Sequence, residues 1–282
     1  MNEAEIKKLT VIGAGNMAEA LIQGITKNQL IKAGNIWVTN RSNQKRLEEM
    51  KEKYGVNVSY DMADLLSDAE IILLAMKPKD AAGAMEQIKP YLTKETLIVS
   101  VLAGVSTKSI ELLAGRPLPI ARAMPNTSAA IGLSATAVAV NDKVSSGQRQ
   151  RIKTIFDTVG LTVFVTEEQL DAVTGVSGSG PAYVYYLAEA MINGAEKVGL
   201  EPDTARALVR QTLLGAAHML TETEKSPEQL RREVTSPGGT TEAGLKILQE
   251  RRTDEAVIEC IKAATDRSKQ LGNELANQLK AK

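Results

Sequence analysis

The sequence predicts an α/β protein with an N-terminal doubly wound parallel sheet and an all-helical C-terminal domain. Short apolar runs alternate with helical patterns over the first half of the chain, and a glycine-rich turn follows the first of these runs. After about Thr166 the helical patterns continue and no convincing strand is left. Alternating strands and helices are typical of a doubly wound parallel sheet. We therefore predict two domains, residues 1–165 and 166–282.

The predicted strands are short runs of β-branched and other apolar residues. Two of them, residues 71–75 and 97–101, are near-continuous apolar stretches, as expected for parallel strands buried on both faces. The others cover residues 9–12, 36–39, 119–123, 135–140 and 161–165. The predicted helices cover residues 17–25, 43–54, 182–198, 204–220, 228–234, 241–250 and 254–279. Those of the second half are rich in small residues, which is typical of closely packed dimer interfaces.

The composition excludes several classes of function. Lys plus Arg equal Asp plus Glu, 34 against 34, and aromatic residues make up only 3%, so the chain has no general field or stacking surface for nucleic acid. The single cysteine, Cys260, allows no internal disulfide, and with one histidine, His218, a zinc site of thiolates and imidazoles is nearly excluded. Since acidic residues do not cluster suggestively either, we predict no metal site.

The chain also carries no sign of membrane insertion or export. Its first residues, MNEAEIKKLTVIG, contain no long apolar stretch before the first predicted strand, so no secretory signal is recognisable. The longest apolar runs, such as residues 71–76, are far too short to cross a bilayer. We expect a cytoplasmic protein whose chemistry depends on an organic cofactor or on carboxylates, hydroxyls and backbone groups.

The glycine-rich turn after the first strand has the spacing of a dinucleotide-binding fingerprint. Gly13 permits the tight turn, Gly15 lets backbone N–H groups approach a pyrophosphate, and Ala18 is small enough for close helix–strand packing. The following helix N-terminus favours phosphate. The alternative is a turn with no ligand. We assign the cofactor contacts of this turn to Ile12, Gly13, Ala14, Gly15, Asn16 and Met17.

The end of the second strand indicates which dinucleotide is bound. Sites selective for NAD usually carry Asp or Glu here, to bind the ribose 2′-hydroxyl. This chain has Asn40, Arg41 and Ser42, with Lys45 and Arg46 shortly after. Arg41 can bind a 2′-phosphate with two donors, and its neighbours can donate hydrogen bonds. We therefore predict NADPH as the preferred cofactor, with NADH as the alternative; the competing interpretation is an ordinary solvated loop.

Further loops follow later strands, at the sheet edge where ligands bind in such folds. We predict cofactor contacts at the ends of the strands at 71–75, 97–101 and 119–123, from Ala75, Met76, Lys77, Pro78, Ala103, Gly104 and Asn126. Lys77 could instead be a surface lysine. Asn126 could orient the nicotinamide or simply form a turn.

Two glycine-containing segments stand out in the helical half, at residues 171–183 and 230–245. Both lead into a helix start. Pro181 suits a first helical turn, and the pair Gly238-Gly239 leaves N–H groups bare ahead of the next helix, where a small carboxylate could bind. Two capped helix starts without a ligand would be the simpler interpretation, but it explains two such elaborate segments poorly.

Four motifs in order make the chain resemble the pyrroline-5-carboxylate reductases. They are Gly-Ala-Gly-Asn-Met at 13–17, Met-Pro-Asn-Thr at 124–127, Val-Thr-Gly-Val-Ser-Gly-Ser-Gly-Pro-Ala-Tyr at 173–183 and Val-Thr-Ser-Pro-Gly-Gly-Thr-Thr at 234–241. The resemblance runs from about residue 8 to 272, and the last two motifs are highly specific to that family.

The resemblance implies a Rossmann domain and a helical domain that interlocks with a partner in a homodimer, with decamers common. It also implies a site where the cofactor domain of one subunit meets the helical domain of another. The implied reaction moves a hydride to C5 of the protonated imine of 1-pyrroline-5-carboxylate and yields proline. Thr241 matches the catalytic threonine that meets the ring nitrogen. The implied substrate contacts are Glu167, Ser177, Ser179, Gly239, Thr240 and Thr241.

Two positions depart from the family pattern. Asp61 and Glu233 are acidic where relatives often carry Asn near the cofactor, so we leave both outside the predicted site. His218 lies in an apolar helical pattern and is interpreted as a packed or half-exposed helix residue, not a proton donor.

Other functions share this architecture. A β-hydroxyacid dehydrogenase would need a catalytic lysine within the helix at 182–198, which offers Lys197 only at its far end. A general imine reductase and an inactive dinucleotide sensor are the remaining alternatives, although a sensor would be expected to have a damaged Pro-Gly-Gly-Thr-Thr segment. The final oligomer, the strength of the NADPH preference, feedback by proline and the role as main enzyme or paralogue are left open by the sequence.

Overall fold

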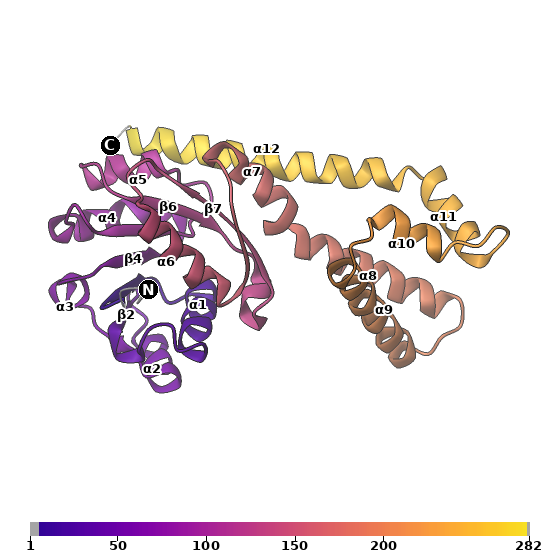
Figure 1. Ribbon diagram of the computed structural model, residues 1–282, viewed down its shortest axis with the longest axis horizontal. Helices are drawn as coiled ribbons and strands as arrows, with labels where there is room; N and C mark the ends of the chain where they lie inside the picture. Colours follow the sequence, from indigo (N-terminus) through magenta and orange to yellow (C-terminus); the bar gives the residue numbers. More distant parts are fainter. Residues whose placement is uncertain (1–5, 281–282) are drawn as a thin grey trace. The chain divides into compact units, whose positions relative to one another are not determined.

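The computed structural model describes residues 6–280, apart from the side chains of residues 275 and 278–280. The chain divides into two compact units (Figure 1). The first comprises Met1–Ser179 together with Ala263–Lys282, and the second is Gly180–Lys262. The predicted boundary near residue 165 follows the last strand of the sheet, whereas these units divide at residues 179 and 262. The C-terminal helix therefore contributes to both units.

The first unit is built on one eight-stranded sheet in the order β3-β2-β1-β4-β5-β6-β7-β8. The order of its first six strands is that of a dinucleotide-binding Rossmann sheet. The strands are β1 (Leu9–Ile12), β2 (Ile36–Thr39), β3 (Asn57–Val58), β4 (Ile71–Leu74), β5 (Leu97–Ser100), β6 (Ile120–Met124), β7 (Ser134–Val140) and β8 (Gly160–Phe164).

The first six strands are parallel, and the last two run in the opposite direction. β6 pairs with β7 in antiparallel register, Ala121 opposite Val140, and β8 then pairs parallel to β7. Only residues 125–133 connect β6 to β7, which is too short for the crossover that a parallel pair requires. The predicted α/β fold class is confirmed, and the reversed pair at one edge refines it.

Twelve helices connect and flank these strands among the described residues. They are α1 (Asn16–Lys27), α2 (Gln44–Tyr54), α3 (Met62–Leu66), α4 (Ala81–Ile88), α5 (Thr107–Ala114), α6 (Ser146–Asp157), α7 (Leu170–Val173), α8 (Gly180–Lys197), α9 (Pro202–Glu222), α10 (Pro227–Glu233), α11 (Thr240–Glu250) and α12 (Thr253–Lys280). Three short turns matter for the site: η2 (Pro78–Asp80), η5 (Glu167–Gln169) and the π-helical turn η6 (Thr174–Gly178).

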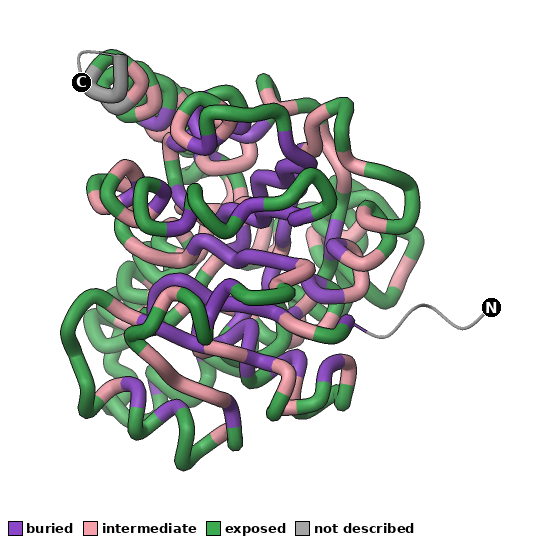
Figure 2. The backbone as a smooth tube through the Cα atoms, turned by 90° about the vertical axis from the view of Figure 1, so that its left-hand side faces the viewer, coloured by how far each residue is buried: buried purple, intermediate pink, exposed green. Residues whose placement is uncertain are grey.

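Helices cover the sheet on both faces. Buried side chains of α1, α2 and α6 pack on one face, and those of α3, α4 and α5 pack on the other. β1, β4 and β5 are buried along their whole length, and Figure 2 shows these buried strands between layers of more exposed chain. This two-sided burial explains why the central strands have no polar–apolar alternation in the sequence. Because these strands pair in parallel, the carboxyl ends of β1, β2, β4, β5 and β6 lie at one edge of the sheet.

The second unit has almost no core of its own. Within residues 180–262, all of which the structure describes, only Ala205 and Val209 are buried. Large apolar side chains such as Tyr185, Tyr186 and Val198 are 65%, 77% and 83% exposed. Such extensive apolar exposure marks an interaction surface. No helix in the described part of the chain is long and apolar enough to span a bilayer.

Candidate functional site

The glycine turn after β1 has the geometry that close phosphate approach requires. Gly13 adopts φ +116°, and a Cβ atom there would lie 2.6 Å from the carbonyl group of Ala75. Gly13 N donates to Thr39 O at 2.8 Å, so the turn is held between β2 and β4. A Cβ at Gly15 would meet no atom within 4 Å, and no side chain caps α1 at this residue. The first N–H groups of α1 thus remain available to an anion, and the turn fits a dinucleotide pyrophosphate.

A charged network behind the turn fixes its carbonyl side. Arg46 Nε donates to Ala14 O at 3.0 Å, and the same guanidinium forms an ion pair with Glu19 of α1. Glu19 also accepts hydrogen bonds from Lys53 at 2.9 Å and Tyr54 at 2.8 Å. The hydrogen bond from Arg46 is the largest cause that lowers the pKa of Glu19, from 4.5 to about 2. Arg46 is therefore a structural support of the glycine turn rather than a free cation for the cofactor.

We expect Glu19→Gln to lower stability near neutral pH and to flatten the acid limb of the stability curve. The folded pKa of Glu19 is about 2 and its ordinary value is 4.5, so its stabilisation is complete above 4.5 and is lost as pH falls toward 2. Denaturant unfolding at several pH values measures the effect. Glu52→Gln, which removes an exposed carboxylate from α2, is the matched control, and equal pH curves for the two variants would contradict the assignment.

At the end of β2 the structure leaves Arg41 and Lys45 as exposed cations. The Arg41 side chain is 87% exposed and lies 3.8 Å from Asp80 of η2. Asn40 is engaged within its own loop: its Nδ2 donates to Asn43 O at 2.8 Å, and its Oδ1 accepts from Asn43 N at 2.7 Å and from Tyr60 Oη at 3.0 Å. Ser42 is exposed beside Arg41. A 2′-phosphate at this edge would meet Arg41 first.

The loops after β4 and β5 lie at the same edge as the glycine turn. Ala75 N donates to Ile12 O at 2.9 Å, which places the predicted contacts at 75–78 directly beside the turn. In the β5 loop, Ala103 is exposed and Gly104 adopts φ +74°. A Cβ at Gly104 would lie 3.3 Å from Gly272 N of α12, so helix and loop pack backbone to backbone. The sheet topology therefore brings the predicted cofactor segments of β1, β4 and β5 together.

The loop after β6 contacts the first serine–glycine segment directly. Asn126 Nδ2 donates to Ser177 O at 3.1 Å, and its Oδ1 accepts from Ser128 N at 3.1 Å. Ser177 lies in η6, and π-helical turns are frequent at functional sites. A Cβ at Gly178 would come within 2.9 Å of Met124 Cε, which explains a glycine at this close approach. Asn126, Ser177 and Ser179 thus belong to one packed group in the first unit.

Glu167 supports the β5–α5 loop. Its carboxylate accepts hydrogen bonds from Thr107 N at 2.7 Å and from Thr107 Oγ1, at the start of α5. The Glu167 carboxylate also forms an ion pair with Arg122, with Arg122 Nη1 at 3.5 Å from Glu167 Oε1. The Arg122 side chain is only 8% exposed. The carboxylate therefore neutralises a buried guanidinium and the N-terminal end of a helix. The predicted contact of Glu167 with substrate stays a prediction beside these observed contacts.

We expect Glu167→Gln to destabilise the first unit by about 2 kcal/mol, because it leaves the Arg122 charge buried without a counter-charge. The value is below that of a fully buried pair since Glu167 is 28% exposed. Thermal and denaturant unfolding measure it against Glu168→Gln, which removes the neighbouring exposed carboxylate. Equal stability of the two variants would refute the structural role, and a raised KM for substrate in Glu167→Gln would support the predicted substrate contact.

The second unit presents the other predicted substrate residues at the start of α11. The prediction that the N–H groups of the glycine pair are bare is wrong, because Gly239 N donates to Ser236 O at 3.0 Å and Gly238 N donates to Glu242 Oε2 at 2.7 Å. The N–H groups of Thr240 and Thr241 begin the helix and have no helical acceptor. A cavity of about 710 Å³ lies beside this turn and is lined by α10 and α11, including Arg231, Arg232, Thr235, Gly238, Gly239, Glu242 and Lys246.

Three residues that the sequence analysis kept out of the site have local structural partners. Asp61 is the N-cap of α3 and accepts from Ala63 N at 2.7 Å. Glu233 forms an ion pair with Lys225 at 2.8 Å. His218 lies on α9, exposed in the described chain, with its Nδ1 2.8 Å from Glu222. None of these contacts involves a predicted site residue.

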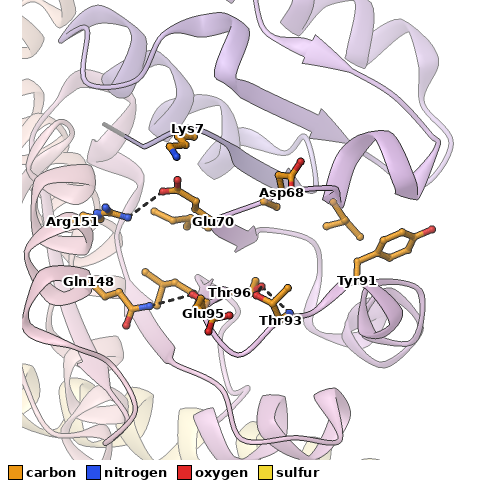
Figure 3. A pocket seen from close by; sticks show the side chains of 13 residues that line it. Lys7, Asp68, Glu70, Tyr91, Thr93, Glu95, Thr96, Gln148 and Arg151 are labelled. Atoms are coloured by element: carbon orange, nitrogen blue, oxygen red, sulfur yellow. Dashed lines mark hydrogen bonds and ion pairs between the residues drawn. The ribbon is translucent and has the colours of Figure 1, made fainter. Parts of the chain in front are cut away.

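A second large hollow lies at the opposite edge of the sheet. The cavity of about 790 Å³ in Figure 3 opens at the amino ends of β4 and β5. Arg151 donates to Glu70 at 3.1 Å across it, and Gln148 Nε2 donates to Glu95 O at 3.3 Å. Dinucleotides bind at the carboxyl ends of the strands in such sheets, so this cavity is separate from the cofactor edge.

The supporting roles of Glu19 and Arg122 were not predicted from the sequence. The prediction that Arg46 belongs to a basic cluster facing the cofactor phosphate is wrong, because its guanidinium is bound to Ala14 O and Glu19. Arg46 contacts Ala14 across 32 positions of sequence, and Glu167 contacts Thr107 across 60. The charges of Glu19 and Arg46 are visible in the sequence, but no local pattern pairs them. Only the adjacency of α1 and α2 on one face of the sheet does so.

Comparisons with known proteins agree with this arrangement. A family model for pyrroline-5-carboxylate reductase dimerisation matches residues 167–271, and a model described as NADP oxidoreductase, coenzyme F420-dependent, matches residues 8–104. The chain is 48% identical to "Pyrroline-5-carboxylate reductase 2" of Bacillus subtilis over 271 residues, which is 96% of this chain and 97% of the relative.

Solved structures give the same result. A pyrroline-5-carboxylate reductase from Coxiella burnetii matches with a TM-score of 0.89 and 40% identity, covering 94% of this chain and 98% of that one. The pyrroline carboxylate reductase of Plasmodium falciparum with NADP bound matches with a TM-score of 0.83 and 30% identity, over 95% and 99% of the two chains. By its sheet order, its glycine turn and these full-length relatives, the chain belongs to the pyrroline-5-carboxylate reductase family.

Proposed function

We propose that this chain reduces 1-pyrroline-5-carboxylate to L-proline with NADPH as preferred cofactor, as an oxidoreductase acting on a C–N double bond in the last step of proline biosynthesis. The observation that carries the proposal is the full-length identity of 48% to a relative named for this activity. It is supported by an intact Pro237-Gly238-Gly239-Thr240-Thr241 segment at a helix start.

The residues of the chain bind and orient the two reactants. When bound, the dinucleotide would supply a hydride to C5 of the imine, whose nitrogen is already protonated, so that the addition would leave the amine of proline and the oxidised dinucleotide. The glycine turn, residues 13–17, binds the pyrophosphate together with Lys77. Arg41 binds the 2′-phosphate. The Thr241 hydroxyl oxygen accepts a hydrogen bond from the protonated ring nitrogen, and Thr240 with the backbone around Gly239 binds the substrate carboxylate. Positioning of this kind can lower a barrier by up to roughly 7–11 kcal/mol.

The proposed reaction needs no strong acid or base from the protein, because a protonated imine carbon is already electrophilic. Ser177 and Ser179 are proposed to contact the substrate from the segment packed against Asn126, and Asn126 itself is proposed to face the nicotinamide. These assignments come from the family motif, and the observed contact between Asn126 and the Ser177 carbonyl supports placing them in one group.

The experiment that tests the activity follows oxidation of NADPH by the purified protein with pyrroline-5-carboxylate, with NADH in parallel, and identifies proline as the product. Proline formation with a higher kcat/KM for NADPH is the expected result. Tight binding of NADPH without turnover would contradict the proposed substrate and would favour another imine substrate or a dinucleotide sensor. A higher kcat/KM for NADH would overturn the proposed cofactor preference.

We propose further that the protein is a cytoplasmic homodimer, with a decamer built from such dimers as the alternative final assembly, and that residues 1–165 and 166–282 are its functional domains. The match to a dimerisation model and the bare apolar side chains of α8 support self-association. Light scattering coupled to size exclusion is expected to give the mass of two or of ten chains. A monomer at micromolar concentration would contradict the proposal.

A further inference from the structure

We propose that Asp80 is a specificity-determining residue that weakens the binding of a 2′-phosphate at the cofactor edge. The inference rests on the NADPH-dependent function proposed above and deepens it. The discrimination between NADPH and NADH depends on which charged side chains near the end of β2 are exposed and can contact a phosphate.

Arg41 and Lys45 are the cations left exposed at this position. Arg46 uses its guanidinium on Ala14 O, Glu19 and Glu49. Asn40 uses its amide within its own loop and on Tyr60. Of the charged donors that the sequence offered here, the structure leaves Arg41 and Lys45 exposed, and Arg41, whose side chain is 87% exposed, is the one that can bind a phosphate with two donors.

Asp80 is the acidic group paired with that cation. Its Oδ1 lies 3.8 Å from Arg41 Nη1, and its side chain is 35% exposed. Arg41 follows β2 and Asp80 belongs to η2 after β4, while β1 lies between those strands in the sheet. The ion pair therefore spans the edge where the glycine turn leaves β1. Asp80 directly precedes α4, but its carboxylate makes no capping hydrogen bond to that helix, so it interacts with the helix only through its charge.

The ion pair between Arg41 and Asp80 is weak enough for a cofactor phosphate to replace Asp80 as the partner of Arg41. The Asp80 carboxylate then repels that phosphate. Exposed ion pairs contribute only about 0.2–1 kcal/mol, so a 2′-phosphate carrying about −1.5 to −2 charges takes over the guanidinium. Asp80 remains within a few ångströms of that guanidinium and repels the phosphate. The neutral 2′-hydroxyl of NADH meets no such repulsion. Lys77 and Lys79 are exposed beside Asp80. Their attraction for the phosphate is the same whether residue 80 is Asp or Asn, so they do not affect the difference between the two proteins.

The test is the substitution Asp80→Asn, which keeps shape and hydrogen-bonding capacity and removes one charge. Titration calorimetry with NADP⁺ and with NAD⁺ gives two dissociation constants without any need for turnover. We expect the Kd for NADP⁺ to fall about two- to five-fold, as the charge removed is that of one exposed pair, with the Kd for NAD⁺ unchanged. The gain should shrink at high ionic strength, where exposed charges are screened.

The matched control is Glu86→Gln, which removes an exposed carboxylate from α4 of the same segment and should change neither constant. A higher Kd for NADP⁺ in Asp80→Asn would overturn the inference, because it would show that Asp80 orients Arg41 for phosphate binding. An NADP⁺ constant that follows the Glu86→Gln control would overturn it as well. If the wild type binds NADP⁺ but does not reduce pyrroline-5-carboxylate, the proposed activity fails while the binding ratio still decides the role of Asp80.

Discussion

Replacing Thr241 by Ala is expected to lower kcat for pyrroline-5-carboxylate about 10²–10³-fold, the usual cost of losing one hydrogen-bonding group aimed at a reacting centre. Thr241 is the second residue of α11, half-buried and directly behind the Gly238-Gly239 turn. A hydroxyl at this point is carried on a helix start and so has a fixed direction. The Kd for NADPH should be unchanged, because Thr241 belongs to the second unit and the glycine turn to the first.

Thr241→Ser is the matched control, since it keeps the hydroxyl and removes only a methyl group. We expect it to retain most of the wild-type kcat. Steady-state kinetics with both variants, with NADPH binding measured separately, separate the catalytic effect from a loss of fold. Wild-type turnover by Thr241→Ala would remove the residue from the proposed mechanism.

Replacing Gly15 by Ala is expected to weaken NADPH binding by more than about ten-fold while the protein stays folded. In the structure a Cβ at Gly15 meets nothing within 4 Å, and Gly15 has an ordinary φ of −78°. The methyl group therefore costs the free protein about 1 kcal/mol or less. It would instead occupy the space through which a pyrophosphate approaches the N–H groups of α1.

Two neighbouring substitutions make this expectation specific. Gly83→Ala also adds a methyl group in open space, but within α4 and away from the turn, so NADPH binding should be kept. Gly13→Ala should instead reduce stability, because its Cβ would stand 2.6 Å from Ala75 backbone at φ +116°. Binding titrations together with melting curves measure all three, and unimpaired NADPH binding by Gly15→Ala would contradict the placement of the phosphates.

Long elements with a clear period or a clear turn could be predicted from the sequence. β1 and β2 have the predicted bounds, and Gly55 ends α2 at φ 70°, as its position indicated. β3 was not predicted, because two residues have no period to recognise. The reversal of β7 and β8 was not predicted either, since strand direction depends on how a connection crosses the sheet.

The predicted site divides in the same way. The glycine turn and the two serine- and threonine-containing segments are local patterns, so their positions could be found directly. The fates of Asn40 and Arg46 could not, because the first is fixed by Tyr60 and the second by Glu19, both far along the chain. In the fold the Asn40 amide donates to Asn43 O and accepts from Tyr60, and the Arg46 guanidinium donates to Glu19 and Glu49.

The sequence by itself therefore determined the fold class, the cofactor turn, the family resemblance and the segments proposed to bind the substrate. These features are carried by neighbouring residues, whose spacing sets the backbone conformation directly. Only the tertiary structure decided which charges stay free at the cofactor edge, that Glu167 neutralises buried Arg122, and that residues 180–262 leave their apolar faces bare. Those outcomes depend on which elements the sheet brings side by side, and hydrogen bonding and burial are settled among groups that lie dozens of residues apart.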